Sequence, residues 1–344
     1  MKTDIFKFDL PEELIAQFPA EPRESARLLH IYKEGYEPCH VSDLPDLLRP
    51  GDLLVLNDTK VIPARIYGKR GAASIELTLF KQLSETTWQT MIKNSRRLKE
   101  NDQIIFAQNL TGTVLKKYDT FVDVMFNLKT TDLFNILHKI GIMPLPPYIK
   151  RSQSGEESDK QNYQTVFAKK EGAVAAPTAS LHLTKNLMQK LKDKKIEFVF
   201  GTLHVGGGTF LPVKVDDTDN HVMHAEFGEL SAEAADKINQ AKQQGRRVIP
   251  VGTTALRLLE SAAVDTGVVH PFCKETDIFI VPGYHFKIAD ALITNFHLSG
   301  STLFMLVCAF AGIEEMKAAY QYAIENKFRF FSYGDACFIE RKDF

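Results

Sequence analysis

Four short segments combine glycine with hydroxyl, amide or imidazole side chains more densely than packing requires. They are AAPTASLHL (175–183), TLHVGGGTF (202–210), VGTTALR (251–257) and TNFHLSGSTL (294–303). Imidazole exchanges protons near neutral pH, and glycine turns present main-chain N–H groups to an anion or a flat ligand. The segments therefore predict proton transfer or anion binding, although an ordinary capped turn would also explain each one taken alone.

Three imidazoles and two further polar side chains are the candidates within these segments. His204 and His297 each follow a stretch of strand character, and His182 lies in the first segment with Thr178. Asn295 ends the strand that precedes His297. Because α/β sheets bind ligands beyond the carboxyl ends of their strands, we expect these side chains to face a common site.

Two glycine turns differ in the chemistry that they suggest. The run Gly206–Gly208, followed by Thr209, lacks the spacing and the following helix of a dinucleotide-binding GxGxxG motif. The turn Gly252–Thr254 opens a predicted helix, where free N–H groups and the helix dipole favour a carboxylate or a phosphate. The sequence leaves open which of these two anions the second turn would hold.

The segment HVMHAEF offers a possible metal site. His221, His224 and Glu226 are suitable ligand types. On a helix, however, Glu226 would not share a face with the histidines, and no further ligand lies close in sequence. We therefore expect no metal, and we interpret the segment as a polar cluster that shapes a substrate loop.

Composition narrows the class of protein without naming a substrate. The 344 residues suggest two structural units, and 42 basic against 43 acidic side chains give a net charge of −1. A polyanion would therefore need a local basic surface. The chain has no apolar run of roughly 20 residues and no signal peptide, and its four cysteines form no CxxC pair. These features predict a cytoplasmic protein without a membrane segment.

The elements that must position the candidate residues fall into two kinds. Residues 62–127 alternate apolar and polar side chains in several short pieces, which predicts a small antiparallel β-barrel. From residue 163 onward, strand and helix patterns alternate, which predicts an α/β domain. Residues 151–162 are polar and predict a mobile surface loop, and residues 9–18 predict a helix that starts near Pro11.

Eleven short segments are spread along nearly the whole chain: LPEELIAQFP, RLL at 27–29, NDTKVIPAR, MPLPPYI, YQTVFA, AVAAPTA, TLHVGGGTF, VGTTALRLLES, TNFHL, STLFMLV and RFFSYGDA. In these segments the chain resembles the S-adenosylmethionine:tRNA ribosyltransferase-isomerase family of queuosine biosynthesis. The resemblance implies an α/β main domain, residues 1–61 and 150–344, with an inserted antiparallel β-barrel domain at residues 62–149. Three positions depart from the family: Ser180 replaces a usual glycine, Leu183 a phenylalanine and Ser299 a proline.

The resemblance also implies a reaction. S-adenosylmethionine serves as the ribosyl donor, and the acceptor is tRNA that carries 7-aminomethyl-7-deazaguanine at the wobble position. The product is epoxyqueuosine-tRNA, with adenine and methionine released. We expect a monomer. The alternative is a family member that binds tRNA without activity, and an ordinary tRNA methyltransferase is a further rival.

We assign expected roles on that basis, although a structural role is an open alternative for each residue. His204 and His297 are the candidates for proton transfer, with His182 third. The residues expected to bind S-adenosylmethionine are Gly206, Gly207, Gly208, Thr209, Gly252, Thr253, Thr254 and Arg257. The residues expected to bind the tRNA substrate are Asp58, Arg65, Thr178, Asn295, Arg329, Tyr333 and Asp335.

Overall fold

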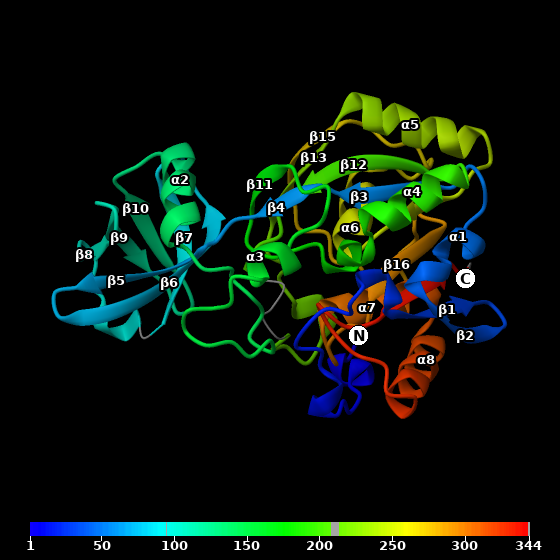
Figure 1. Cartoon of the computed structure of the whole chain (residues 1–344), viewed down its shortest axis with the longest axis horizontal. Coiled ribbons are helices and arrows are strands. Elements are labelled where there is room, and N and C mark those ends of the chain that lie inside the picture. The colour runs from blue at the N-terminus through cyan, green and yellow to red at the C-terminus, as the bar shows by residue number, and fades with distance from the viewer. Residues whose placement is uncertain (94, 208–212, 343–344) are drawn as a thin grey trace.

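The computed structural model describes residues 1–93, 95–207 and 213–342. A β-barrel lies beside a larger α/β domain, and the chain passes between them twice (Figure 1). Both the antiparallel barrel and the α/β architecture expected from the sequence are confirmed. Among the described helices, none is long and apolar enough to cross a bilayer.

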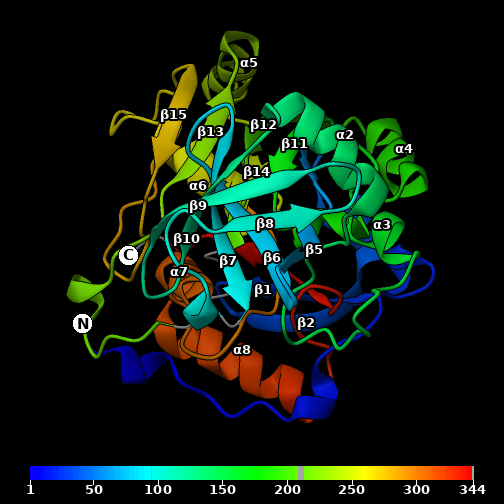
Figure 2. The same cartoon turned by 90° about the vertical axis from the view of Figure 1, so that its left-hand side faces the viewer.

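The barrel is closed by six antiparallel strands in the order β10-β7-β6-β5-β8-β9 (Figure 2). The strands are β5 (Arg65–Arg70), β6 (Ala73–Gln82), β7 (Thr87–Lys93), β8 (Gln103–Phe106), β9 (Thr111–Lys117) and β10 (Val122–Phe126). Alternate residues of β6, namely Ile75, Leu77 and Leu79, fill the interior, as period-two alternation predicts. Helix α2 (Thr130–Ile140) packs against the barrel through Leu133 and Leu137.

Two sheets form the centre of the α/β domain. The first has the order β14-β3-β12-β13-β15, with β3 (Leu53–Asn57), β12 (Glu197–Leu203), β13 (Glu226–Leu230), β14 (Val248–Pro250) and β15 (Phe272–Thr276). Strands β14, β3 and β12 are parallel, and β13 and β15 are antiparallel additions. Every residue of β3 is buried, which is typical of a central parallel strand.

The second sheet has the order β16-β17-β1-β2. Its strands are β1 (Arg27–Tyr32), β2 (Gly35–His40), β16 (Ala291–Asn295) and β17 (Ala336–Glu340). A parallel bridge between Val251 and Ile293 joins the two sheets, and the N–H of Gly252 donates to the carbonyl of Ile293 at 2.7 Å. The sheets thus continue into one another beside the Gly252 turn.

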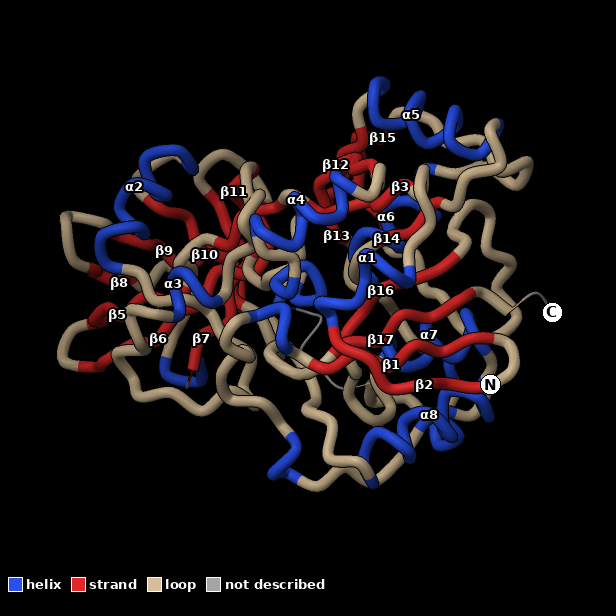
Figure 3. The backbone as a smooth tube through the Cα atoms, turned by 45° about the vertical axis from the view of Figure 1, so that its right-hand side comes forward, coloured by secondary structure: helices blue, strands red, loops and turns tan. Residues whose placement is uncertain are grey.

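Helices cover both faces of these sheets (Figure 3). The helices are α1 (Leu44–Leu47), α4 (Lys185–Asp193), α5 (Ala232–Gln243), α6 (Thr253–Ala262), α7 (Thr302–Ala311) and α8 (Ile313–Glu325). Leu53 and Val55 of β3 pack with residues of α5 to α8, whereas Leu54 and Leu56 pack with residues of α1 and α4. The alternation of a strand therefore divides the core into two layers.

The junction between the two domains is built from short pairings. Strands β4 (Thr59–Val61) and β11 (Lys170–Ala173) form a parallel pair, and Arg65 bridges Ile142 where the chain enters and leaves the barrel. These contacts lie at the ends of the predicted insertion, residues 62–149. The segment 151–162, predicted as mobile, ends in the short helix α3 (Asp159–Asn162). Arg151 pairs with Asp159, the first residue of this helix, at 3.1 Å, and both side chains are almost fully buried.

The prediction of a helix from Pro11 onward is wrong. Only a single 3₁₀ turn forms there, at Glu12–Leu14. The following residues pair instead with a distant segment: Ile15 bridges Phe330, and the N–H of Ala16 donates to the carbonyl of Phe330 at 3.3 Å. A tertiary pairing has overridden the local helical pattern.

Candidate active site

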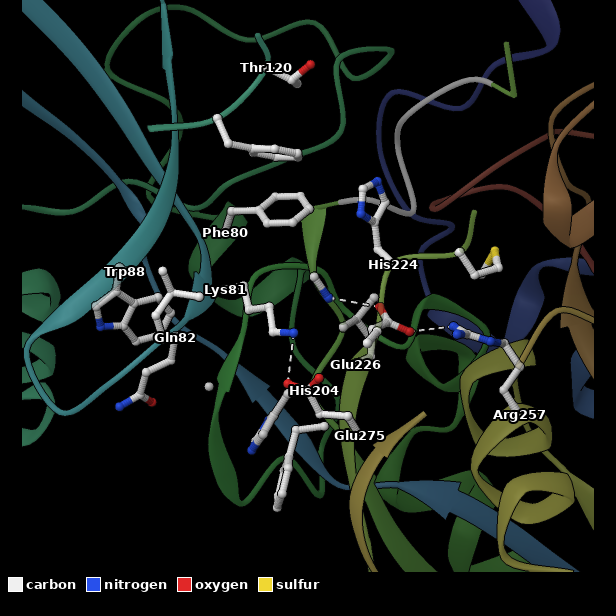
Figure 4. A pocket seen from close by; sticks show the side chains of 18 of the residues that line it. Phe80, Lys81, Gln82, Trp88, Thr120, His204, His224, Glu226, Arg257 and Glu275 are labelled. Carbon is white, nitrogen blue, oxygen red and sulfur yellow. Dashed lines mark hydrogen bonds and ion pairs between the residues drawn. The ribbon is translucent and has the colours of Figure 1, made fainter. Parts of the chain in front are cut away.

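A cavity of about 800 Å³ lies between the barrel and the α/β domain (Figure 4). Phe80, Trp88 and Phe121 line it from the barrel side. The α/β domain contributes, among others, His204, Gly206, Glu226 and Arg257. A volume of this size is typical of a pocket for a small organic ligand.

The barrel side of the cavity is aromatic. The rings of Phe80 and Phe121 lie 4.4 Å apart between centroids, and the imidazole of His224 meets both edge-on at 5.7 and 5.9 Å. A β-bulge between Leu79 and Lys81 interrupts the pairing of β6 with β7, and Phe80 occupies it. Bulges re-aim side chains, and Phe80 here lines the cavity and not the barrel core.

His204 directly follows β12 and lines the opposite side of the cavity. Its Nδ1 lies 2.8 Å from the hydroxyl of Thr59, which fixes the ring. Gly172 packs against the imidazole so closely that a Cβ there would lie 3.0 Å from ring atoms. Burial lowers the pKa of His204 below its ordinary 6.5, an effect that the charge of Asp58 opposes. The imidazole is therefore neutral near pH 7 and able to accept a proton.

A buried ion pair lies on the wall beside the glycine loop. Arg257 of α6 pairs through Nη1 with the carboxylate of Glu226, at the start of β13 (Figure 4). The same carboxylate accepts a hydrogen bond from the N–H of Gly206 at 3.0 Å. Gly206 and Arg257, each predicted to bind S-adenosylmethionine, thus meet at one carboxylate.

A smaller cavity of about 80 Å³ adjoins the first, and Val205 and Leu303 line both. The predicted site residues that line the smaller cavity are Thr178, Gly252, Thr253, Thr254, Asn295 and His297. Thr178 donates to the amide oxygen of Asn295 at 3.1 Å. The N–H of Gly252 is already used by the sheet, so the helix entry offers fewer free donors to an anion than the sequence suggested.

His182 and His297 are buried in or near the smaller cavity. His297 Nε2 lies 3.0 Å from the hydroxyl of Thr294, and His182 Nε2 lies 3.3 Å from the amide of Asn295. Burial lowers the pKa of His297 to about 3 and that of His182 to about 4. Both imidazoles are neutral near pH 7, and neither lines the large cavity, whereas His204 does.

These depressed pKa values predict acid sensitivity of the fold. Between pH 6.5 and the folded-state pKa, His297 binds a proton in the unfolded chain but not in the folded chain. Its contribution to the free energy of unfolding is therefore full above pH 6.5 and decreases as the pH falls. We expect His297 to remove ~2 kcal/mol from the free energy of unfolding between pH 7 and pH 5. Denaturation of His297→Asn at both pH values should show a smaller loss than the wild type. His285→Asn, which removes an exposed imidazole, is the matched control.

The remaining predicted substrate contacts lie outside both cavities. Asp58 accepts a hydrogen bond from Thr202 at 2.6 Å, and Tyr333 packs edge-on against Tyr163. The two oxygens of Asp335 accept hydrogen bonds from the backbone N–H groups of Arg27 and Arg329.

The contacts of Asp335 join segments that lie far apart in the sequence. The side chains of Arg27 and Arg329 also approach Asp335, at 3.3 and 3.5 Å. The Nε of Arg65, at the barrel entry, is buried without a hydrogen-bond partner in the described part of the chain. The roles in tRNA binding that we expected for Asp58, Arg65, Arg329, Tyr333 and Asp335 stay predictions.

Two glycines of the run, Gly206 and Gly207, lie beside the large cavity. Gly206 lines the large cavity, and a Cβ on Gly207 would lie 3.0 Å from the ring of Phe80, so this loop and the barrel are in close contact. The predicted contacts Gly208 and Thr209 lie outside the described residues.

The structure accommodates the three departures from the family pattern. Ser180 lies in a 3₁₀ turn without positive φ, and its hydroxyl donates to the carbonyl of Val251 at 3.4 Å. Leu183 is buried in the core beside α4. The hydroxyl of Ser299 accepts a hydrogen bond from the N–H of Phe8 at 2.7 Å.

Several cavity residues were not expected from the sequence. Phe80, Trp88 and Phe121 belong to barrel segments that we interpreted as structural. Lys81, also on the barrel, pairs with Glu275 of β15 at 2.8 Å, and both residues line the cavity. No local signal links these barrel residues to segments more than a hundred positions away. Within the described residues, no group of His, Cys, Asp or Glu is arranged to hold a metal ion.

Fold and site together define a two-domain α/β protein with an inserted β-barrel and a ligand cavity where the two meet. The family described as "Queuosine biosynthesis protein" matches residues 3–339. The S-adenosylmethionine:tRNA ribosyltransferase-isomerase of Zymomonas mobilis is 52% identical over 339 residues, which cover 98% of this chain and 99% of that relative. The protein of the same name from Brucella ovis is 49% identical over 357 residues, covering 100% and 98%.

A solved structure agrees with these relatives. The crystal structure of S-adenosylmethionine tRNA ribosyltransferase from Thermotoga maritima is similar with a TM-score of 0.56 and 33% identity, and the match covers 97% of this chain and 99% of that one. The chain belongs to the queuosine biosynthesis protein family.

Proposed function

We propose that this protein is the S-adenosylmethionine:tRNA ribosyltransferase-isomerase of its organism. It transfers and isomerises the ribosyl part of S-adenosylmethionine onto the aminomethyl nitrogen of 7-aminomethyl-7-deazaguanine at the tRNA wobble position. The observation that carries the proposal is the full-length similarity, at about half identity, to two relatives that bear this name. We further expect the protein to act as a cytoplasmic monomer.

The large cavity is the proposed site of S-adenosylmethionine. Its volume of about 800 Å³ suits a nucleoside-sized donor, and its aromatic side offers faces and edges to a planar base. The smaller cavity shares the lining residues Val205 and Leu303 with it and carries hydroxyl, amide and imidazole groups of predicted site residues. A donor-sized volume thus lies beside polar side chains.

His204 is the proposed proton acceptor. The reaction requires removal of a proton from the carbon beside the sulfonium, whose positive charge acidifies it. Of the three predicted histidines, His204 alone lines the large cavity, and its lowered pKa keeps the imidazole neutral. The hydroxyl of Thr59 holds Nδ1, which leaves Nε2 as the second ring nitrogen for substrate.

The proposal is tested with purified protein, S-adenosylmethionine and tRNA that carries 7-aminomethyl-7-deazaguanine. We expect adenine and methionine to appear in equal amounts, with epoxyqueuosine in the tRNA by nucleoside mass. The same tRNA with guanine at the wobble position is the control and should give no adenine. Binding of the modified tRNA without adenine release would identify an inactive binder, and formation of S-adenosylhomocysteine would identify a methyltransferase.

Gly172 offers a test of how His204 is positioned. Its φ of +148° disfavours other residues, and a Cβ there would press on the imidazole at 3.0 Å. We expect Gly172→Ala to slow single-turnover adenine release by about 10–100-fold, because small displacements of a reacting group carry penalties of this size. Gly35→Ala is the matched control, since its φ is +157° and a Cβ there meets no atom within 4 Å. Equal rates in the two variants would argue against the placement of His204.

A further inference from the structure

The Glu226–Arg257 pair is buried but incompletely satisfied. The side chains of Arg257 and Glu226 are 5% and 6% exposed, and both residues line the large cavity. Within the described part of the chain, Nη1 of Arg257 is bound by Glu226 and Nε lies 3.4 Å from the carbonyl of Ile278. Nη2 is buried with no hydrogen-bond partner among those residues. Buried polar groups normally have partners, so an orphaned guanidinium nitrogen beside a cavity points to a ligand.

The carboxylate also has capacity to spare. A carboxylate offers about four acceptor sites. The described partners of Glu226 are the N–H of Gly206 and Nη1 of Arg257, which use one site on each oxygen. Among the residues that the structure describes, the pair therefore presents an unused donor and unused acceptors next to each other.

The charge of the pair selects among ligands. A phosphate would gain from Arg257 but would face the negative charge of Glu226 at the same place. An isolated cation would be attracted by Glu226 but repelled by the positive charge of Arg257. An α-amino acid carries an ammonium and a carboxylate on one carbon, so it matches both members of the pair.

We propose that Glu226 and Arg257 form the clamp for the α-amino acid end of the donor, with Arg257 Nη2 donating to the α-carboxylate and Glu226 accepting from the α-ammonium. This assignment rests on the proposed function, because it identifies the amino acid as the methionyl part of S-adenosylmethionine. The sequence left open whether Arg257 and the Gly252–Thr254 turn hold a carboxylate or a phosphate; the proposal chooses the carboxylate and places it on Arg257 and Glu226 instead of the turn. It also gives Glu226 a binding role that the sequence did not assign.

The test compares ligands on the unaltered protein, by calorimetry without tRNA. The probes are S-adenosylmethionine, decarboxylated S-adenosylmethionine, and the analogue that lacks the α-amino group. We expect each analogue to bind about 10–100-fold more weakly, because a charge-assisted hydrogen bond is lost in each case. Equal affinity for all three, or no measurable binding of S-adenosylmethionine, would overturn the clamp.

Two variants test whether Arg257 and Glu226 cause the difference in affinity between S-adenosylmethionine and its analogues. In Arg257→Lys the ratio of affinities between S-adenosylmethionine and its decarboxylated form should fall towards one, and in Glu226→Gln the ratio against the deaminated analogue should do so. Glu275→Gln alters the other cavity-lining ion pair, with Lys81, and should leave both ratios unchanged. Loss of discrimination in Glu275→Gln alone would overturn the assignment.

The outcome is separate from that of the proposed function. Preference for intact S-adenosylmethionine without adenine release from modified tRNA would support the clamp and contradict the ribosyl transfer. Adenine release without any preference among the three probes would support the transfer and contradict the clamp.

Discussion

Replacing His204 by alanine is expected to slow adenine release in a single turnover by about 10²–10⁴-fold, the usual contribution of a positioned proton-transfer group. The imidazole lines the large cavity, is neutral near pH 7 and is held by Thr59. Affinity for S-adenosylmethionine, measured separately, should change much less. His270→Ala removes an exposed imidazole and serves as the control.

The pH dependence gives an independent check of the same role. Because burial lowers the pKa of His204 below 6.5, the single-turnover rate should be constant near neutrality and fall only below pH 6.5, as the imidazole gains a proton. His204→Ala should lose this acid limb. A variant with near-wild-type rate and an unchanged profile would remove His204 from the chemistry.

The largest expected effect on stability comes from Glu260, a fully buried carboxylate of α6. It accepts hydrogen bonds from the hydroxyl of Tyr284 at 3.2 Å and from three consecutive backbone N–H groups, those of Lys287 at 2.8 Å and of Ile288 and Ala289 at 3.3 Å each. Burial raises its pKa, and the backbone hydrogen bonds act against that rise. The carboxylate thus organises the turn that leads into β16.

Glu260→Ala should lower the free energy of unfolding by about 3 kcal/mol, because it leaves several buried donors without an acceptor. Urea denaturation measures the change. Glu233→Ala on the exposed face of α5 removes a surface pair with Lys237 and should have little effect. A similarly small effect for Glu260→Ala would show that water replaces the carboxylate at no cost.

The sequence predicted those parts of the fold that repeat a local pattern. Alternation in β6 identified the barrel, and the strand–turn–helix around Gly252 appears as β14 and α6. Where a distant pairing decided the structure, prediction failed. The segment after Pro11 resembles a helix, yet it pairs with Phe330, more than three hundred residues away.

The candidate site was also predictable only where local sequence determines it. The polar loops could be found because glycine and histidine at strand ends are visible in the sequence. The two cavities, by contrast, depend on how the barrel meets the α/β domain. Phe80 lies at a bulge that regular alternation does not reveal. Glu226 was not recognised as a binding residue because its partner, Arg257, lies 31 residues later in the sequence.

The proposed ribosyl transfer is examined by following the atoms of S-adenosylmethionine. One preparation carries label in the ribose and the other in the methyl group, and each is incubated with tRNA that contains 7-aminomethyl-7-deazaguanine. We expect the ribose label to enter the tRNA in a one-to-one ratio with released adenine, while the methyl label leaves with methionine. Methyl label in the tRNA, or ribose label that never reaches it, would exclude ribosyl transfer.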